Sequence, residues 1–188
     1  RCQLRPIVGV LLDNSIAMTP HDAVTLDLNT DVVEWCPGHQ RCLAVGTYQL
    51  NEATGAREGR LHLFSFTPAR KLELVAAHDI PGIFDLRWHP RHDSPLIAAA
   101  LADGSVRLVG LESCASWQEV CCTGVQPAAM AVSLDYSRYP GQEGATLAVS
   151  YSDGTLQQLQ VRTWPLASLI GSSVSVKFGV CSRLPGDF

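Results

Sequence analysis

The sequence predicts an all-β fold in which about three four-stranded antiparallel sheets follow one another along the chain. Two observations support this fold class. A sequence unit of about 50 residues recurs along the chain, and inside each unit apolar residues alternate with polar ones. We therefore expect sheets that repeat in space as the units repeat in the sequence.

An aromatic residue marks the same place in each unit, namely Trp35, Trp88 and Tyr136. Two Asp-Gly pairs, which begin at Asp103 and Asp153, recur at a similar interval. An interval of about 50 residues is typical of one blade of a β-propeller, a ring of four-stranded sheets. The sequence thus predicts a partial WD40-like β-propeller.

Each unit begins with a strand that ends at the aromatic residue, because apolar and polar side chains alternate up to that point. A second strand of small apolar residues suits a position where neighbouring sheets approach closely. In the second and third units an Asp-Gly turn then leads to the third strand, since glycine supplies the positive φ of a tight hairpin. The expected second strands are residues 43–48, 96–102 and 147–151, the third strands 59–66, 106–109 and 156–159, and the outer strands 72–76 and 117–121, with 24–28 as the outer strand of a preceding blade.

The three blades occupy residues 23–161 in this interpretation. An irregular segment, residues 1–22, precedes them, and a divergent tail, residues 162–188, follows, in which residues 166–170 could add a strand. Propeller rings contain roughly four to eight blades, so three blades do not close a ring. We therefore expect a fragment or truncated form of a longer propeller protein, with self-association through its unpaired apolar blade faces.

Composition and charge argue against several functions. The chain has 188 residues, of which 46% are hydrophobic and 17% charged, and its net charge is -4. The acidic balance argues against nucleic-acid binding, and no apolar stretch approaches the roughly 20 residues that cross a membrane. The seven cysteines include no CxxC pair, so we expect no metal site, no cofactor and a reducing, intracellular environment.

The repeated residues have structural interpretations. Large aromatic side chains are mostly buried, so we expect Trp35, Trp88 and Tyr136 in the core. Asp103 and Asp153 are expected to form turns rather than to act in catalysis.

Several stretches of the chain resemble a known family. In the first unit they are VEWCP at residues 33–37, LAVGTYQL at 43–50 and GRLHLFSF at 59–66. These are similar to the amino-terminal blade of the WD-repeat family of diphthamide synthesis, whose enzyme is diphthine methyl esterase, also called diphthine methyltransferase. DLRW at residues 85–88, and SLDYS at 133–137 with SDGTL at 152–156, resemble its next two blades. The resemblance covers residues 23–161, although no unit ends in the Trp-Asp dipeptide of the standard WD repeat.

The resemblance implies a hydrolase that cleaves the methyl ester of diphthine, a modified histidine, so that the freed carboxylate can be amidated to diphthamide. It implies a cytoplasmic protein whose partner is elongation factor 2 bearing methylated diphthine. A second function stays open, because a fold does not determine an activity. A partial propeller could be a non-catalytic WD-repeat scaffold that binds another protein.

Ester hydrolysis needs a nucleophile or an activated water, a base that titrates near neutral pH, and donors for the oxyanion. No Gly-x-Ser-x-Gly elbow occurs, and GSSVS at residues 171–175 lacks its second glycine. We expect the catalytic candidates where the loops before the first strands converge at the mouth of the propeller. These candidates are His78, Asp79, Asp85 and Glu34.

The other histidines have structural interpretations. His89 and His92, with Asp93, lie in a proline-bounded loop, where we expect solvated or turn-bonding roles, with a base or metal ligand as the alternative. We expect His62 at the surface or at a sheet edge. His39 falls in a polar turn, and His21 precedes the first unit.

Overall fold

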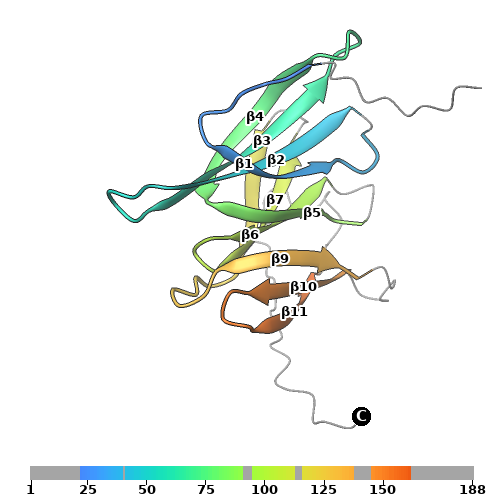
Figure 1. Ribbon diagram of the computed structural model, residues 1–188. Helices are drawn as coiled ribbons and strands as arrows, with labels where there is room; N and C mark the ends of the chain where they lie inside the picture. Colours follow the sequence, from blue (N-terminus) through green and yellow to red (C-terminus); the bar gives the residue numbers. More distant parts are fainter. Residues whose placement is uncertain (1–21, 40, 91–94, 113–115, 138–144, 162–188) are drawn as a thin grey trace, which may run out of the picture.

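The computed structural model describes residues 22–39, 41–90, 95–112, 116–137 and 145–161. These residues form three antiparallel sheets, which we name blades 1, 2 and 3, and blade 2 lies between the other two (Figure 1). The described part of the chain has no helix long and apolar enough to cross a membrane. The strands are β1 (Asn29–Trp35), β2 (Cys42–Leu50), β3 (Arg57–Phe66) and β4 (Leu72–Pro81) in blade 1; β5 (Ile83–Trp88), β6 (Leu96–Leu101), β7 (Val106–Glu112) and β8 (Ser116–Cys122) in blade 2; and β9 (Ala131–Tyr136), β10 (Ala145–Tyr151) and β11 (Leu156–Val161) in blade 3.

The strands of each blade pair in chain order, with the first strand innermost. This arrangement confirms the predicted fold class, a partial β-propeller of antiparallel blades. The outer strands predicted at residues 72–76 and 117–121 are present as β4 and β8. The strand expected at 166–170 lies outside the described residues, as do residues 1–21 and the whole tail from 162 to 188.

Residues 24–28 were expected to form a strand, and this expectation is wrong. They connect the outer edge of blade 1 to its inner edge. The amide of Leu72, at the start of β4, donates a hydrogen bond to the carboxylate of Asp22 at 2.7 Å. From there the chain reaches the first residue of β1, at the opposite edge of the sheet.

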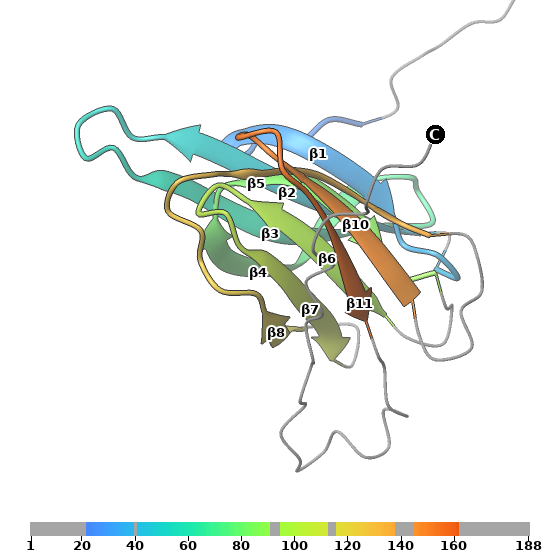
Figure 2. The same ribbon diagram turned by 90° about the horizontal axis from the view of Figure 1, so that it is seen from below.

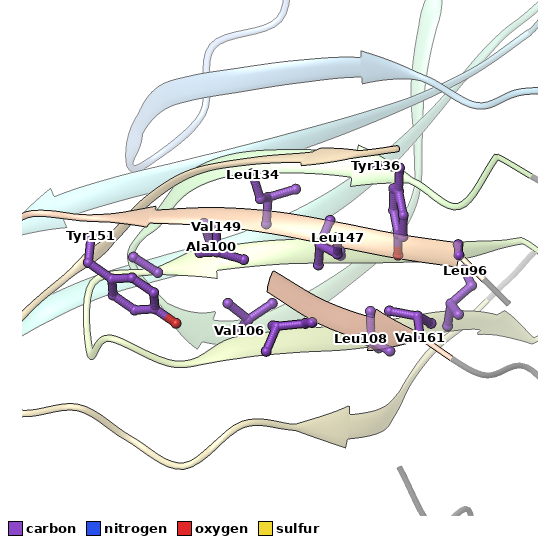
Figure 3. Close-up of a cluster of buried hydrophobic side chains, with 14 of the residues drawn as sticks. Leu96, Ala100, Val106, Leu108, Leu134, Tyr136, Leu147, Val149, Tyr151 and Val161 are labelled. Carbon is purple, nitrogen blue, oxygen red and sulfur yellow. The ribbon is translucent and has the colours of Figure 1, made fainter. Parts of the chain in front are cut away.

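Blade 2 contributes to a core on each of its faces, because alternate residues of a strand point to opposite sides of a sheet. β6 is buried along its whole length. Its odd-numbered residues belong to the core shared with blade 1, and Leu96, Ala98 and Ala100 belong to the core shared with blade 3 (Figure 3). The small side chains of β6 allow both neighbouring blades to approach, as its sequence predicted.

Two of the three aromatic marker residues are buried, and one is not. Trp88 and Tyr136 are only 5% and 6% exposed, which confirms their place in the core. Trp35 is 56% exposed and stacks on Phe66 with 5.2 Å between ring centroids, so the prediction that it is a core residue is wrong. The reason is its position on the face of blade 1 turned away from blade 2, where no described blade covers it.

Both Asp-Gly pairs form the predicted hairpin turns. Gly104 and Gly154 have φ values of 78° and 87°, in the left-handed region that favours glycine. Asp103 Oδ1 accepts a hydrogen bond from the Ser105 amide at 2.9 Å, and Asp153 makes the equivalent bond in blade 3. The corresponding hairpin of blade 1, between β2 and β3, is longer and projects beyond the other strands (Figure 2).

Candidate functional site

The candidate site lies along the innermost strands of the three blades, β1, β5 and β9. Each of them pairs with only one strand of its own blade, so a row of its backbone groups has no partner strand. Backbone amides in partly buried positions need another acceptor. At each of the two contacts between neighbouring blades, a carboxylate on the innermost strand of the preceding blade is this acceptor. We name the contact of Glu34 with the Trp88 amide joint 1–2, and the contact of Asp85 with the Leu134 amide joint 2–3.

Joint 1–2 holds Glu34 and Trp88 together by two hydrogen bonds. Glu34 Oε2 accepts a bond from the Trp88 backbone amide at 3.0 Å. The indole Nε1 of Trp88 donates to the backbone oxygen of Glu34 at 3.3 Å. Within the described residues, the Trp88 amide is the one donor that bonds the Glu34 carboxylate.

The environment of Glu34 changes its acidity. Desolvation by burial disfavours the charged form and raises the pKa of Glu34 from 4.5 to about 7. The Arg87 guanidinium and the Trp88 amide oppose this rise, whereas the charges of Asp85 and Asp135 add to it. A carboxylate whose pKa is close to 7 can take up and release a proton at neutral pH, as general acid-base catalysis requires.

Asp85, at joint 2–3, has a full set of hydrogen-bond partners and is only 7% exposed. One carboxylate oxygen accepts bonds from the Leu86 amide at 2.9 Å and from Arg87 Nη1 at 2.7 Å. The other accepts bonds from Ser133 Oγ at 2.9 Å and from the Leu134 amide at 3.0 Å. These four donors make Asp85 a clamp between blades 2 and 3, with no oxygen left over for a substrate.

A charged residue occupies the penultimate position of each innermost strand: Glu34 in β1, Arg87 in β5 and Asp135 in β9. Arg87 Nε lies 3.8 Å from Asp135 Oδ1. Arg87 and Asp135 were not among the sequence candidates. Aligning the three units at their aromatic residues would have found them, since a charged residue directly precedes the aromatic in every unit.

The structure separates the four sequence candidates into two places. Glu34 and Asp85 lie on innermost strands, whereas His78 and Asp79 lie on β4, the outermost strand of blade 1 (Figure 1). The expectation that all four share one opening is therefore not met. Asp79 instead pairs with Arg60 at 2.6 Å in a cleft of about 800 Å³ at the end of blade 1.

Two of the remaining histidines, His89 and His62, occupy different environments from those expected. His89 is fully buried, with its ring 5.4 Å from the ring of Tyr136, and so it is not solvated. His62 is only 5% exposed, which contradicts a surface position, and burial lowers its pKa. His39 is exposed in its turn, whereas His21, His92 and Asp93 lie outside the described residues. Among the described residues no group of histidine, cysteine and acidic side chains could hold a metal ion.

Three proteins of known name align with most of this chain. The mouse diphthine methyltransferase is 29% identical over 178 residues, which cover 76% of this chain. The human protein of the same name is 30% identical over 169 residues, and that of Schizosaccharomyces pombe is 32% identical over 133 residues. The chain is related to the diphthine methyltransferases.

The chain spans little more than a third of the length of these diphthine methyltransferases, namely 37% of the mouse and human proteins and 38% of the yeast protein. No family model matches the sequence. Among solved structures, Sqt1 from Chaetomium thermophilum, a WD40 protein, superimposes with a TM-score of 0.55 over 71% of this chain and 33% of its own. Its sequence identity of 14% limits this likeness to the fold.

Proposed function

We propose that this chain hydrolyses the methyl ester of diphthine on elongation factor 2, in the cytoplasm, as a step of diphthamide biosynthesis. The names of its relatives support the pathway. The observation that carries the chemistry is Glu34, a partly buried carboxylate whose pKa lies at about 7. A base of this strength is suited to activating a water molecule at neutral pH.

In this mechanism the ionised Glu34 removes a proton from water while the water oxygen forms a bond to the ester carbonyl carbon. The carbonyl electron pair moves to its oxygen and gives a tetrahedral oxyanion. When the oxyanion collapses, the bond to the methoxy oxygen breaks, and the protonated Glu34 returns its proton to the leaving methoxide. The products are methanol and the carboxyl group of diphthine, so atoms and electrons balance without a further reactant.

The experiment incubates the purified chain with elongation factor 2 that carries methylated diphthine, and mass spectrometry follows the exchange of a methyl group for a proton. We expect Glu34→Gln to lower the rate by roughly 10²- to 10⁴-fold, the usual contribution of a general base. Because the base must be ionised, the wild-type rate should rise with pH and level off above about 7.

Glu34→Gln is a well-matched variant, since its side-chain oxygen can still accept the bond from the Trp88 amide. A full-length diphthine methyltransferase, run in parallel, confirms that the substrate is competent. A wild-type chain that releases no methyl group, beside an active full-length relative, would refute the proposed hydrolysis. An unchanged rate in Glu34→Gln would refute the role of Glu34.

A non-catalytic scaffold is the second candidate, and the outward face of blade 1 favours it. Val33 and Trp35 are 61% and 56% exposed on this face. Exposed apolar side chains of this kind are typical of association surfaces, including contacts between two copies of one chain. Size-exclusion chromatography of the wild type and Trp35→Glu tests this candidate: self-association that the variant abolishes supports it, and two monomers contradict self-association.

A further inference from the structure

Cys36 and Cys42 lie opposite each other at the end of the β1–β2 pair in blade 1. The register of these strands pairs Trp35 with Leu43, so the next step pairs Cys36 with Cys42. The Cys36 amide donates a hydrogen bond to the backbone oxygen of Cys42 at 2.9 Å. Opposed residues of an antiparallel pair have Cα atoms about 4.5–5.5 Å apart. This separation is within the range of about 4.4–6.8 Å that a disulfide bridges.

Both cysteines face the core between blades 1 and 2, since directly opposed residues share one face of a sheet. Cys36 is only 4% exposed and belongs to the core cluster that contains Trp88. Cys42 packs against the same cluster. The two side chains therefore meet in one apolar region beside joint 1–2, where Cys36 follows Glu34 by two residues.

The two cysteines are in the reduced form and differ in accessibility. Cys42 is partly exposed, whereas Cys36 is buried. An oxidant dissolved in water therefore reaches Cys42 first, and Cys36 is in position to react with the oxidised sulfur. An accessible cysteine beside a second, resolving cysteine is the usual arrangement of a redox-sensitive pair.

Cys121 and Cys122 provide a contrast within the same chain. They are neighbours along β8, so their side chains point to opposite faces of blade 2. Burial raises the pKa of both thiols, which lowers the fraction of reactive thiolate. Proximity in sequence does not favour a bridge here, whereas the strand register favours one between Cys36 and Cys42.

We propose that Cys36 and Cys42 are an oxidation site, at which a peroxide converts the two thiols into a reversible disulfide that links β1 to β2 beside joint 1–2. The inference does not depend on the proposed hydrolysis. In a reducing compartment such a bond is transient, as is typical of redox-sensing disulfides.

The reaction balances with hydrogen peroxide as the oxidant. The Cys42 sulfur attacks one peroxide oxygen, the O–O bond breaks, and the departing hydroxide takes the thiol proton, which gives water and a sulfenic acid on Cys42. The Cys36 sulfur then attacks the Cys42 sulfur, the S–O bond breaks, and the departing hydroxide takes the Cys36 proton as a second water. The two sulfurs lose two electrons and the peroxide gains them. A dithiol reductant reverses the oxidation by disulfide exchange.

The test treats the reduced chain with hydrogen peroxide, blocks the remaining thiols with iodoacetamide and digests the chain with trypsin. Trypsin cleaves after Arg41, so Cys36 and Cys42 fall in separate peptides, residues 2–41 and 42–57. A disulfide joins these peptides into one species that is two hydrogen atoms lighter than their sum. We expect mass spectrometry to detect this species after treatment, and dithiothreitol to separate its two peptides.

Serine variants identify the sulfurs that take part. Cys36→Ser and Cys42→Ser should both lack the linked species. Cys42 is the less buried position, so its variant keeps the test valid if Cys36→Ser fails to fold. Cys2 lies in the same peptide as Cys36, and Cys2→Ser is therefore the matched control, which should retain the linked species.

Thermal unfolding provides a second measurement. A bond that closes the β1–β2 turn reduces the freedom of the unfolded chain, so the treated wild type should unfold about 5 °C above the reduced wild type. Treated Cys42→Ser should show no such rise. If peroxide leaves Cys36 and Cys42 as accessible to alkylation as before, or joins either to another cysteine, the inference is wrong. Neither measurement uses the hydrolysis, so an inactive chain would still decide the question.

Discussion

Joint 1–2 and joint 2–3 use a carboxylate for the same purpose but surround it differently. Each carboxylate accepts the hydrogen bond of a backbone amide on the unpaired edge of the next blade. Asp85 receives three further hydrogen bonds, one of them from a guanidinium. Glu34 receives only the bond from the Trp88 amide among the described residues.

The difference shows how one structural device can acquire a chemical property. Burial disfavours a charged carboxylate unless hydrogen bonds and opposite charges compensate for lost hydration. Asp85 has that compensation and serves as a clamp. Glu34 lacks most of it, and its pKa rises to about 7. The number of hydrogen-bond donors therefore distinguishes the two joints.

The largest effect should come from removing the aromatic residue of joint 1–2. Trp88→Ala should lower the free energy of unfolding by about 3–5 kcal/mol, because it leaves a cavity between blades 1 and 2. Trp35→Ala is the matched control and should cost less than about 1 kcal/mol, since an exposed ring loses little contact. Urea denaturation measures both losses. Similar losses in the two variants would contradict the assignment of joint 1–2 as a packed interface.

Removing the carboxylates should separate the two joints directly. Asp85→Ala should destabilise the chain by about 2–4 kcal/mol, because it leaves Arg87 and two donors of blade 3 without their acceptor. Glu34→Gln should change stability by less than about 0.5 kcal/mol at about pH 4, where Glu34 is protonated in the folded chain and the amide oxygen of glutamine can replace it as acceptor. The comparison uses the same denaturation experiment at one pH. An Asp85→Ala variant as stable as Glu34→Gln would show that joint 2–3 is not the stronger clamp.

The two Asp-Gly turns test how tightly blade 2 is enclosed in comparison with blade 3. An alanine Cβ at Gly104 would meet the backbone oxygens of Ala129 and Gln126, whereas at Gly154 it would meet nothing within 4 Å. Both substitutions incur the cost of a positive φ, about 1 kcal/mol. The steric conflict should raise the total for Gly104→Ala to about 2–3 kcal/mol. Thermal unfolding of the two variants should rank them in this order, and equal losses would place the blade 2 turn in open space.

A dependence of stability on pH should also arise at joint 1–2. The pKa of Glu34 is about 7 in the folded chain and close to 4.5 in the unfolded chain. Between these values the folded state holds a proton that the unfolded state has released, so the free energy of unfolding should fall as pH rises through this window and then level off. Glu34→Gln should lack this component. If the free energy of unfolding depends on pH in the same way in the wild type and in Glu34→Gln, this prediction is wrong.

Local sequence patterns predicted most of the fold. The repeat, the alternation within strands and the Asp-Gly pairs located the blades, because each depends on residues close together in the chain. The same patterns misplaced Trp35, because alternation shows that a side chain faces one side of a sheet but not whether another sheet covers that side. They also misplaced His62. Its burial depends on the side chains that pack around blade 1, and not on the residues that precede and follow it in β3.

The candidate site could be predicted only in part. Glu34 and Asp85 were expected near an opening, but the pKa of Glu34 is raised by burial, and its carboxylate binds a backbone amide 54 residues away in the chain. No sequence pattern marks the side chain that accepts such a bond, because the donor is a backbone amide, which every residue except proline has. His78 and Asp79 were placed at that opening because the outer strand was expected to end at residue 76, whereas β4 continues to Pro81 and includes both residues.

Titration of Glu34 itself in the wild-type chain, followed by NMR of its side-chain carboxyl carbon between pH 3 and pH 9, tests the proposed base directly. We predict a midpoint at about 7, with the Trp88 amide signal shifting at the same pH because the two groups are hydrogen-bonded. A midpoint close to the ordinary value of 4.5 would contradict this prediction, and the proposed base would have no basis in this structure.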